Sequence, residues 1–314
     1  LTEMTSLLST IAGVFSYIIA GYILKKINVI PDNISKKFDY ASFNVLLPLA
    51  LVTNFWMIKF PDIIVYQLVL AFFGAGVLVF IIGFFISKKL YQFKPDDSAL
   101  FGLSACFGNS VAFGIPLMYS ILGPINAMPY MILVLFHGFI HFTYTTLIIE
   151  GFRNRSQSGI KRLIKTIIGL TKNIVLFGMF IGIFLNYAEI PFPYPLKVIL
   201  MPIAKIALPT VLISLGFALA GFKIANQLSY SVVLTLLKNF IHPLIGFIIA
   251  KYIFDMSPLL VFIVTMAAAL PSGSQSYYFS YRYNSLQDIT SANIVLSTFV
   301  SFFTLSILIL IFGY

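Results

Sequence analysis

The sequence predicts an all-α polytopic membrane protein, with about ten transmembrane helices arranged as two inverted five-helix repeats. Of its 314 residues, 60% are hydrophobic and only 10% are charged, and long apolar stretches in such a chain indicate helices that cross a membrane. The fourth and ninth apolar stretches are each interrupted by glycine, proline and polar residues. Because each interruption falls at the same place in its half, we expect helices 4 and 9 to be broken and to cross each other.

Ten apolar segments are each long enough, at about twenty residues, to cross the hydrocarbon core of a bilayer as a helix. The first segment lacks the basic leader of a cleaved signal peptide, so we expect it to remain as a helix. The predicted spans are Leu7–Leu24, Phe38–Met57, Ile63–Ser87, Ala99–Leu122, Pro129–Ile149, Asn173–Tyr187, Leu196–Ala220, Tyr230–Phe254, Pro258–Tyr281 and Ile289–Phe312.

Basic residues are distributed unequally between the two sets of loops. The loops after even-numbered spans contain only Lys59, Lys197 and Lys251, whereas those after odd-numbered spans contain many more. Since basic loops stay on the cytoplasmic side, the sequence predicts a multi-pass protein of the cell (plasma) membrane with both termini outside. The basic set consists of Lys25, Lys26, Lys36, Lys37, Lys88, Lys89, Lys94, Arg153, Arg155, Lys161, Arg162, Lys165, Lys223 and Arg282.

The two halves of the chain share a pattern of prolines. The second span of each half contains one (Pro48 and Pro209), and the fourth span of each half is interrupted near another (Pro116 and Pro271). The alternative is that these prolines only kink ordinary spans, since proline is common in membrane helices. Two interruptions at corresponding positions favour the broken helices of a transporter.

This pattern divides the chain into three parts. Residues 1–150 form the first five-helix repeat, residues 151–170 form a cytoplasmic basic loop, and residues 171–314 form the second repeat. Because five spans are an odd number, the second repeat must enter the membrane from the opposite face, which makes the two repeats inverted. The binding site is then expected at the midplane, between the repeats.

The two interruptions are the candidate binding site. A broken helix in hydrocarbon is tolerated only inside protein or beside a water-filled cavity, and its half-helix ends suit an ion or a charged substrate. The amide of Asn109 can hold a carboxylate by charge-assisted hydrogen bonds, although it could instead only cap the broken helix. The candidate substrate-binding residues are Asn109, Ser110, Gly114 and Pro116 at the first break, and Pro271, Ser272, Gly273, Ser274 and Gln275 at the second.

Ionisable residues inside spans are candidates for charge or proton coupling. Lys238 lies well inside the eighth span, where a charge is functional by default, although a lysine can also extend its charge to an interface. His137 and His141 are four residues apart and share a helix face, so they could relay protons or be hydrogen-bonded packing residues. His242 precedes Pro243, and we expect it to help satisfy the kinked backbone.

Aspartate and glutamate are missing from the centres of the predicted spans. A sodium–proton antiporter would need such carboxylates to bind its cation, whereas lysine, histidine and the positive ends of half-helices favour an anion. A bile-acid-type sodium symporter, the first alternative, would need clustered carboxylates and amides. A membrane sensor that binds a ligand without moving it is the second alternative.

Several other functions are excluded or disfavoured. The net charge of +10 lies in short loops between spans, where it orients the protein, so we expect no nucleic-acid partner. The single Cys106 excludes a disulfide within the chain and a cysteine-rich metal site. A nucleophile–base pair or an H-E-x-x-H motif does not occur, so we predict no enzyme, no metal and no cofactor. The predicted partners are a small organic acid and the lipid bilayer, with a homodimer as the oligomeric state to test.

The same residues resemble the auxin efflux carrier family, which includes bacterial organic-acid permeases and the plant PIN carriers. The fourth span resembles the family's N-x-x-x-x-G-I-P-L crossover, here Asn109 to Leu117, and the ninth resembles its A-L-P-x-G, here Ala269 to Gly273. The family-like residues elsewhere are Ile213-Ser214-Leu215-Gly216, Lys238 with Pro243, Phe279 and Tyr283-Asn284.

The resemblance implies a fold like that of sodium–proton antiporters and bile-acid symporters, with a moving transport part, a fixed scaffold and an elevator-type motion. It implies a small organic anion as substrate, most nearly a dicarboxylate such as malate or malonate, and it adds Asn173 to the substrate-binding candidates. The chain departs from the plant carriers in its short central loop, in having Gln275 and Ser276 where they have a second proline, and in Ile174 after Asn173. These differences argue against auxin itself.

Overall fold

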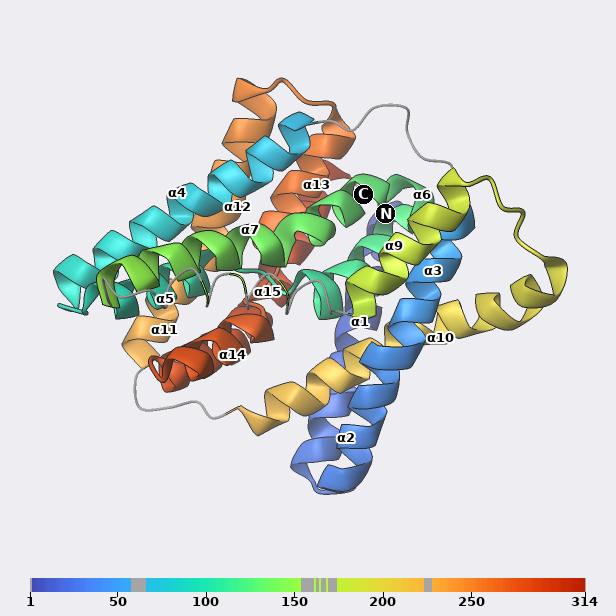
Figure 1. Ribbon diagram of the computed structural model, residues 1–314, viewed down its shortest axis with the longest axis horizontal. Helices are drawn as coiled ribbons and strands as arrows, with labels where there is room; N and C mark the ends of the chain where they lie inside the picture. Colours follow the sequence, from blue (N-terminus) through green and yellow to red (C-terminus); the bar gives the residue numbers. More distant parts are fainter. Residues whose placement is uncertain are drawn as a thin grey trace.

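The computed structural model describes residues 2–57, 66–153, 161, 164, 168, 174–222 and 228–313. All its named elements are helical, as predicted (Figure 1). In the first half they are α1 (Thr2–Lys26), α2 (Asp32–Ala41), η1 (Ser42–Leu46), α3 (Leu47–Met57), α4 (Tyr66–Leu90), α5 (Pro95–Cys106), η2 (Ser110–Gly114), α6 (Ile115–Asn126) and α7 (Met128–Arg153). In the second half they are α9 (Ile174–Tyr187), α10 (Tyr194–Gly221), α11 (Leu228–Leu236), η3 (Leu237–Ile241), α12 (His242–Ile248), η4 (Ile249–Ile253), α13 (Pro258–Ala269), α14 (Ser274–Tyr283) and α15 (Gln287–Phe312).

Six helical stretches in the described residues are long and apolar enough to cross a membrane. Three shorter apolar stretches, 110–126, 174–187 and 258–269, accompany them. Two of these three belong to the spans that were predicted to be broken, which explains why neither reaches the full length of a membrane crossing. The basic loop predicted at 151–170 lies mostly outside the described residues, and α7 continues to Arg153 before it.

The helices pack as two groups. In the first bundle, which we define as α1, α2, η1, α3, α9 and α10, the most extensive contacts join α1 to α10 and α3 to α9. The second bundle contains the other helices, and its largest contacts join α4 to α5, α12 to α13, α11 to α15 and α5 to α7. Figure 1 shows α3, α9 and α10 gathered on one side, with α4, α5, α11 and α12 on the other.

Three widened helical turns each end two residues before a proline. The π-helical turns η1, η2 and η3 precede Pro48, Pro116 and Pro243 respectively. A proline cannot donate to the carbonyl one turn back, and its ring clashes with that carbonyl. Widening the preceding turn accommodates the ring without ending the helix, so these prolines lie within continuous helical segments.

Both predicted breaks are present. The first separates α5 from η2 at residues 107–109, where Phe107 has an extended backbone, so the chain breaks before Pro116 rather than at it. The second separates α13 from α14 at residues 270–273. Leu270 is extended there, with φ −55° and ψ 146°, because the residue before a proline is driven out of the helical region. The two breaks meet in an antiparallel bridge between Gly108 and Ser272.

Candidate functional site

The two breaks are joined by backbone hydrogen bonds. The Asn109 N–H donates to the Pro271 carbonyl at 2.8 Å, and the Gly273 N–H donates to the Phe107 carbonyl at 3.0 Å. The two predicted breaks therefore meet in the folded chain, which is the contact that the predicted crossing of helices 4 and 9 requires. The crossing brings together two segments that lie more than 150 residues apart in the chain.

Two of the candidate glycines make room for the crossing. A Cβ on Gly273 would lie 2.8 Å from the carbonyl oxygen of Gly108, so a side chain here would separate the two breaks. A Cβ on Gly114 would lie 1.8 Å from the hydroxyl of Tyr130, which donates to the Ser110 carbonyl at 2.6 Å. Both positions thus need glycine for close packing.

The polar atoms of Ser272 at the second break are occupied within the protein. The Ser272 hydroxyl donates to the Ser104 carbonyl at 3.0 Å, and the Ser272 N–H donates to the Ser297 hydroxyl at 2.9 Å. Asn293 of α15 donates to the Ser272 hydroxyl at 2.7 Å and to the Ser104 carbonyl at 3.3 Å, and it accepts from Thr235 at 3.0 Å. This network supplies donors to a carbonyl in the last turn of α5, where a helix leaves its carbonyls without partners.

The three residues that follow Gly273 differ from one another in how deeply they are buried. Ser276 is buried, and its hydroxyl donates to the Gly273 carbonyl at 2.7 Å. Ser274 is partly exposed and Gln275 is exposed. Sequence reasoning missed Asn293 as a partner of this break, although an amide inside an apolar span was a signal that could have found it. Asn173, the remaining substrate-binding candidate, lies outside the described residues.

Lys238 supplies a hydrogen-bond donor at the C-terminal end of the other broken helix, α13. Its side chain is fully buried at 0% exposure, and its Nζ donates to the carbonyl of Ala268 in the last turn of α13. A cation is favourable at this negative end of a helix. The ammonium therefore does not extend to a membrane interface. It also lies near the first break, because a Cβ on Gly108 would be 3.5 Å from Nζ.

The first break leaves its side chains free. Asn109 and Ser110 are 6% and 4% exposed, yet the Asn109 Nδ2 and the Ser110 Oγ have no hydrogen-bond partner among the described residues. Asn109 occupies the N-cap position of η2 but makes no side-chain capping bond. The alternative that Asn109 only caps the helix is therefore wrong. A buried amide donor without a partner costs about 1–3 kcal/mol, which is the kind of cost found at binding sites.

The electrostatics of the crossover are thus asymmetric. Lys238 donates a hydrogen bond to a carbonyl at the end of α13. Ser272 and Asn293 donate to a carbonyl at the end of α5. The N-terminal end that begins at Ser110 keeps a free amide and a free hydroxyl beside it. A helix N-terminus with its partial positive charge attracts anions. The arrangement can therefore bind an anion at the first break.

The histidines lie close to this site. His137 and His141 share a face of α7, as predicted, with ring centroids 4.6 Å apart, and both are buried. His242 was expected to satisfy the kinked backbone, but its Nδ1 lies 3.4 Å from the Lys238 Nζ instead. The helix needs no such help because η3 widens ahead of Pro243. Within the described part of the chain, no group of three or more histidine, cysteine or acidic side chains is placed so that it could hold one metal ion.

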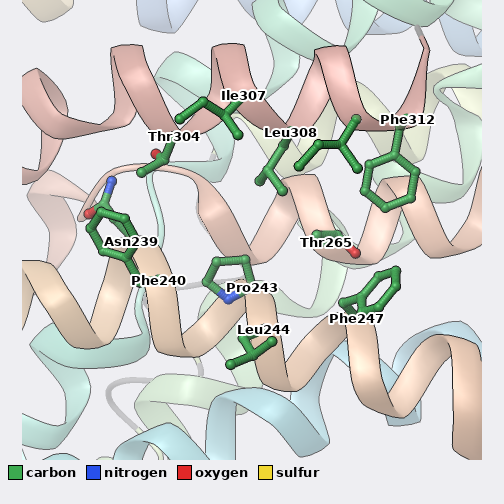
Figure 2. Close-up of a pocket in the computed structure, with 11 residues that line it drawn as sticks. Asn239, Phe240, Pro243, Leu244, Phe247, Thr265, Thr304, Ile307, Leu308 and Phe312 are labelled. Atoms are coloured by element: carbon green, nitrogen blue, oxygen red, sulfur yellow. The ribbon is translucent and has the colours of Figure 1, made fainter.

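A separate groove of about 280 Å³ lies between α15 and the segment formed by η3 and α12 (Figure 2). Its walls are mostly apolar, and they include Phe240, Leu244, Leu308 and Phe312. The substrate-binding candidates are not among its lining residues. Burying a charge among apolar side chains without partners is costly, so this groove is a poor site for an anion.

Comparisons with known proteins identify the family of this chain. A protein of Rhizobium meliloti (strain 1021) with the name "Putative malonate transporter" is 22% identical over 236 residues, which cover 73% of this chain and 70% of that protein. The family model described as "Membrane transport protein" matches residues 6–309. Because this match covers nearly the whole chain, the protein belongs to this family of membrane transport proteins, the auxin efflux carrier family.

Proposed function

We propose that this protein is a secondary transporter of small organic anions, with a dicarboxylate such as malonate or malate as its substrate. The observation that carries the proposal is the free, buried amide of Asn109 at the N-terminus of a broken helix, with the Ser110 hydroxyl beside it. The name of the Rhizobium meliloti relative supports malonate as the first substrate to test.

A carboxylate fits the first break chemically. Its oxygens accept hydrogen bonds only, and the Asn109 Nδ2 and the Ser110 hydroxyl are donors that lack partners among the residues the structure describes. Lys238 adds a positive charge close to Gly108. A hydrogen bond to a charged group contributes roughly 1.5–3 kcal/mol, so two such bonds contribute roughly 3–6 kcal/mol towards holding the carboxylate.

We propose further that the site moves between the two faces of the membrane by an elevator-type motion. In this account the second bundle carries the crossover and the first bundle is the fixed scaffold. The packing supports it, because the largest contacts of each bundle lie within that bundle. The two breaks and the odd number of predicted spans per half support an inverted repeat, with residues 1–150 and 171–314 as the two repeats and both termini outside the cell membrane.

The test is exchange of labelled malonate. Purified protein in proteoliposomes loaded with unlabelled malonate is expected to take up external labelled malonate saturably, and malate is expected to compete with it. Acetate, which lacks the second carboxylate, is the matched competitor that should fail. Folded protein that exchanges neither dicarboxylate, and whose melting temperature no carboxylate raises, would contradict the proposal.

A further inference from the structure

Three buried histidines form a second polar cluster beside the crossover. This histidine cluster consists of His137, His141 and His242, which are all the histidines in the sequence, and their exposed fractions are 4%, 0% and 0%. The Nε2 atom of each ring is buried and has no partner among the described residues. Because buried polar groups are nearly always paired, three unpaired ring nitrogens in one place call for an explanation.

The cluster surrounds one aromatic ring directly behind the first break. Phe72 of α4 contacts all three histidines, with ring centroids 5.8 Å from His137, 6.3 Å from His141 and 5.9 Å from His242. Phe107, which begins the first break, lies 4.3 Å from the His137 ring. The histidine cluster and the anion site are therefore neighbours, separated by Phe107 and Lys238.

The neighbours of two rings determine where their protons lie. The Nδ1 of His141 is 2.8 Å from the His137 carbonyl. A carbonyl only accepts, so Nδ1 carries the hydrogen and the Nε2 of His141 is a bare acceptor. The Nδ1 of His242 faces the Lys238 ammonium at 3.4 Å. An ammonium only donates, so this Nδ1 accepts, and the neutral His242 ring carries its hydrogen on Nε2.

The two Nε2 atoms face the same small space over Gly76. A Cβ built on Gly76 would lie 3.1 Å from the Nε2 of His141 and 3.8 Å from the Nε2 of His242. One nitrogen is a bare acceptor and the other a donor, and they make no direct hydrogen bond to each other. They are therefore matched for transfer of a proton through one bridging water molecule. Any side chain at position 76 would fill the space between them.

We propose that Lys238, His242 and His141 form a proton relay that couples uptake of one proton to transport of each anion. This inference rests on the proposed function, and it names the coupling ion. In the transfer step an N–H bond of the Lys238 ammonium breaks as an Nδ1–H bond forms on His242. The Nε2–H bond of His242 breaks as an O–H bond forms on the bridging water, and another O–H bond of that water breaks as an Nε2–H bond forms on His141. The positive charge thus moves from Lys238 to His141, and the proton taken up with the anion binds the Lys238 amine and restores its ammonium. Nothing is oxidised or reduced.

The charge balance favours this coupling. A dianion beside the Lys238 ammonium leaves a net charge of −1 at the site, and one bound proton makes the loaded site neutral. Moving one elementary charge through the membrane potential takes about 2.3 kcal/mol per 100 mV. A neutral loaded site crosses the membrane without this electrical work. The anion and the proton carry opposite charges and attract each other, so each strengthens binding of the other.

A few other ionisable groups lie near Lys238, His242 and His141. Within the described residues, one of these is His137, whose ring centroid lies 4.6 Å from that of His141. The others are Cys106 of α5 and Tyr144 of α7, whose Sγ and Oη lie 3.4 Å apart and pair with each other. The Tyr144 ring centroid is 5.7 Å from that of His141. From α4, the cluster is faced by Phe72, Phe73 and Gly76, which have no ionisable group.

The decisive transport experiment compares Gly76→Ala with Gly74→Ala. Both residues lie in α4, but a Cβ on Gly74 has nothing within 4 Å, so Gly74→Ala is the matched control. Accumulation of labelled malonate is measured with the membrane potential clamped and the external pH one unit below the internal pH, above the range in which malonate itself binds a proton. For one proton per anion, this gradient raises the accumulation ratio about tenfold.

Wild-type protein and Gly74→Ala are expected to show the tenfold rise. Gly76→Ala is expected to keep malonate exchange at equal pH but to lose the rise. A Gly76→Ala variant that still accumulates malonate tenfold would overturn the relay. Wild-type exchange without any response to the pH gradient would overturn the relay and leave the proposed function intact, whereas absence of wild-type exchange would count against the proposed function.

A second measurement does not depend on transport. Labelling histidine with ¹⁵N reports on this cluster alone, because the sequence has no other histidine. Nitrogen NMR of the wild-type protein in lipid is expected to show the hydrogen on Nδ1 of His141 and on Nε2 of His242, with signals assigned by single histidine-to-glutamine variants. The same tautomer at both residues would overturn the relay, whether or not the glycine variants fold.

Discussion

The first break and the second break are built from the same kinds of residue, but they use their polar atoms differently. At the second break, the hydroxyl and the N–H of Ser272 both bind within the protein, and Asn293 binds that hydroxyl. At the first break, the Asn109 Nδ2 and the Ser110 Oγ have no partner among the described residues. The polar atoms of Ser272 at the second break are thus occupied within the protein, whereas two donors at the first break are not.

This difference suggests separate roles for the two breaks, whereas the sequence pattern predicted substrate binding at both. Near-symmetric motifs in two repeats invite the idea that both contribute equally to binding. We propose instead that the second break holds the crossover together and that the first presents donors to the substrate. Four substitutions test this division, and we order them from the largest expected effect to the smallest.

The largest effect is expected from Lys238→Met. Methionine keeps most of the length of the side chain but removes the charge and the donor to the Ala268 carbonyl. An unpartnered buried carbonyl costs about 1–3 kcal/mol, and the anion site loses its neighbouring positive charge. We expect malonate exchange to fall below detection and the melting temperature to drop. Substantial exchange by Lys238→Met would show that the positive charge is not needed.

The next largest effect is expected from Asn109→Ala. Loss of a charge-assisted hydrogen bond worth about 1.5–3 kcal/mol raises the KM for malonate roughly 10- to 100-fold. The melting temperature without substrate should not fall, because the Nδ2 atom has no partner to lose. Asn33→Ala, at an exposed position in α2, is the control, and its KM should match that of the wild type. A lower melting temperature with an unchanged KM would assign Asn109 to structure.

The opposite result is expected from Asn293→Ala. This change removes the hydrogen bonds to Ser272, Ser104 and Thr235, so it should lower stability by about 1–3 kcal/mol for the partners left buried. Thermal unfolding in detergent measures this loss. The KM for malonate should change less than it does in Asn109→Ala. A large rise in KM at unchanged stability would place Asn293 in the binding site.

The smallest effect is expected from Gln275→Ala. Gln275 was a substrate-binding candidate, but it is exposed, and surface substitutions usually stay within about 0.5 kcal/mol. We expect the KM for malonate to change by less than about twofold. A tenfold rise measured in the same exchange assay would return the second break to the substrate-binding site.

Much of the fold follows from local features of the sequence. Apolar length predicts helices that can cross a membrane, and six such helices are found in the described residues. The glycines and prolines near residues 108–116 and 269–276 predict both breaks. The position of the first break differs by several residues, because η2 widens and carries Pro116 within a helical segment. A π-helical turn depends on packing as well as on the proline, so a rule that treats proline as a helix breaker does not reveal it.

The division of roles between the breaks could not be predicted from the sequence. Asn109 and Ser272 are both polar residues in apolar spans, and their difference depends on which partners other helices supply. The partners of Ser272 are Ser104, 168 residues away, and Ser297 and Asn293, which lie on α15. Similarly, His242 joins the histidines of α7 only through the packing of α12 and α7 around Phe72.

The most direct test of the account is equilibrium binding of labelled malonate to Asn109→Ala and Ser272→Ala in lipid nanodiscs. We predict that Asn109→Ala weakens binding at least tenfold with unchanged thermal stability, since about 1.5–3 kcal/mol is lost with its charge-assisted bond. Ser272→Ala should lower thermal stability and keep the affinity within a few-fold of the wild type. Equal loss of affinity in both variants, or loss in Ser272→Ala alone, would contradict the claim that the first break holds the anion.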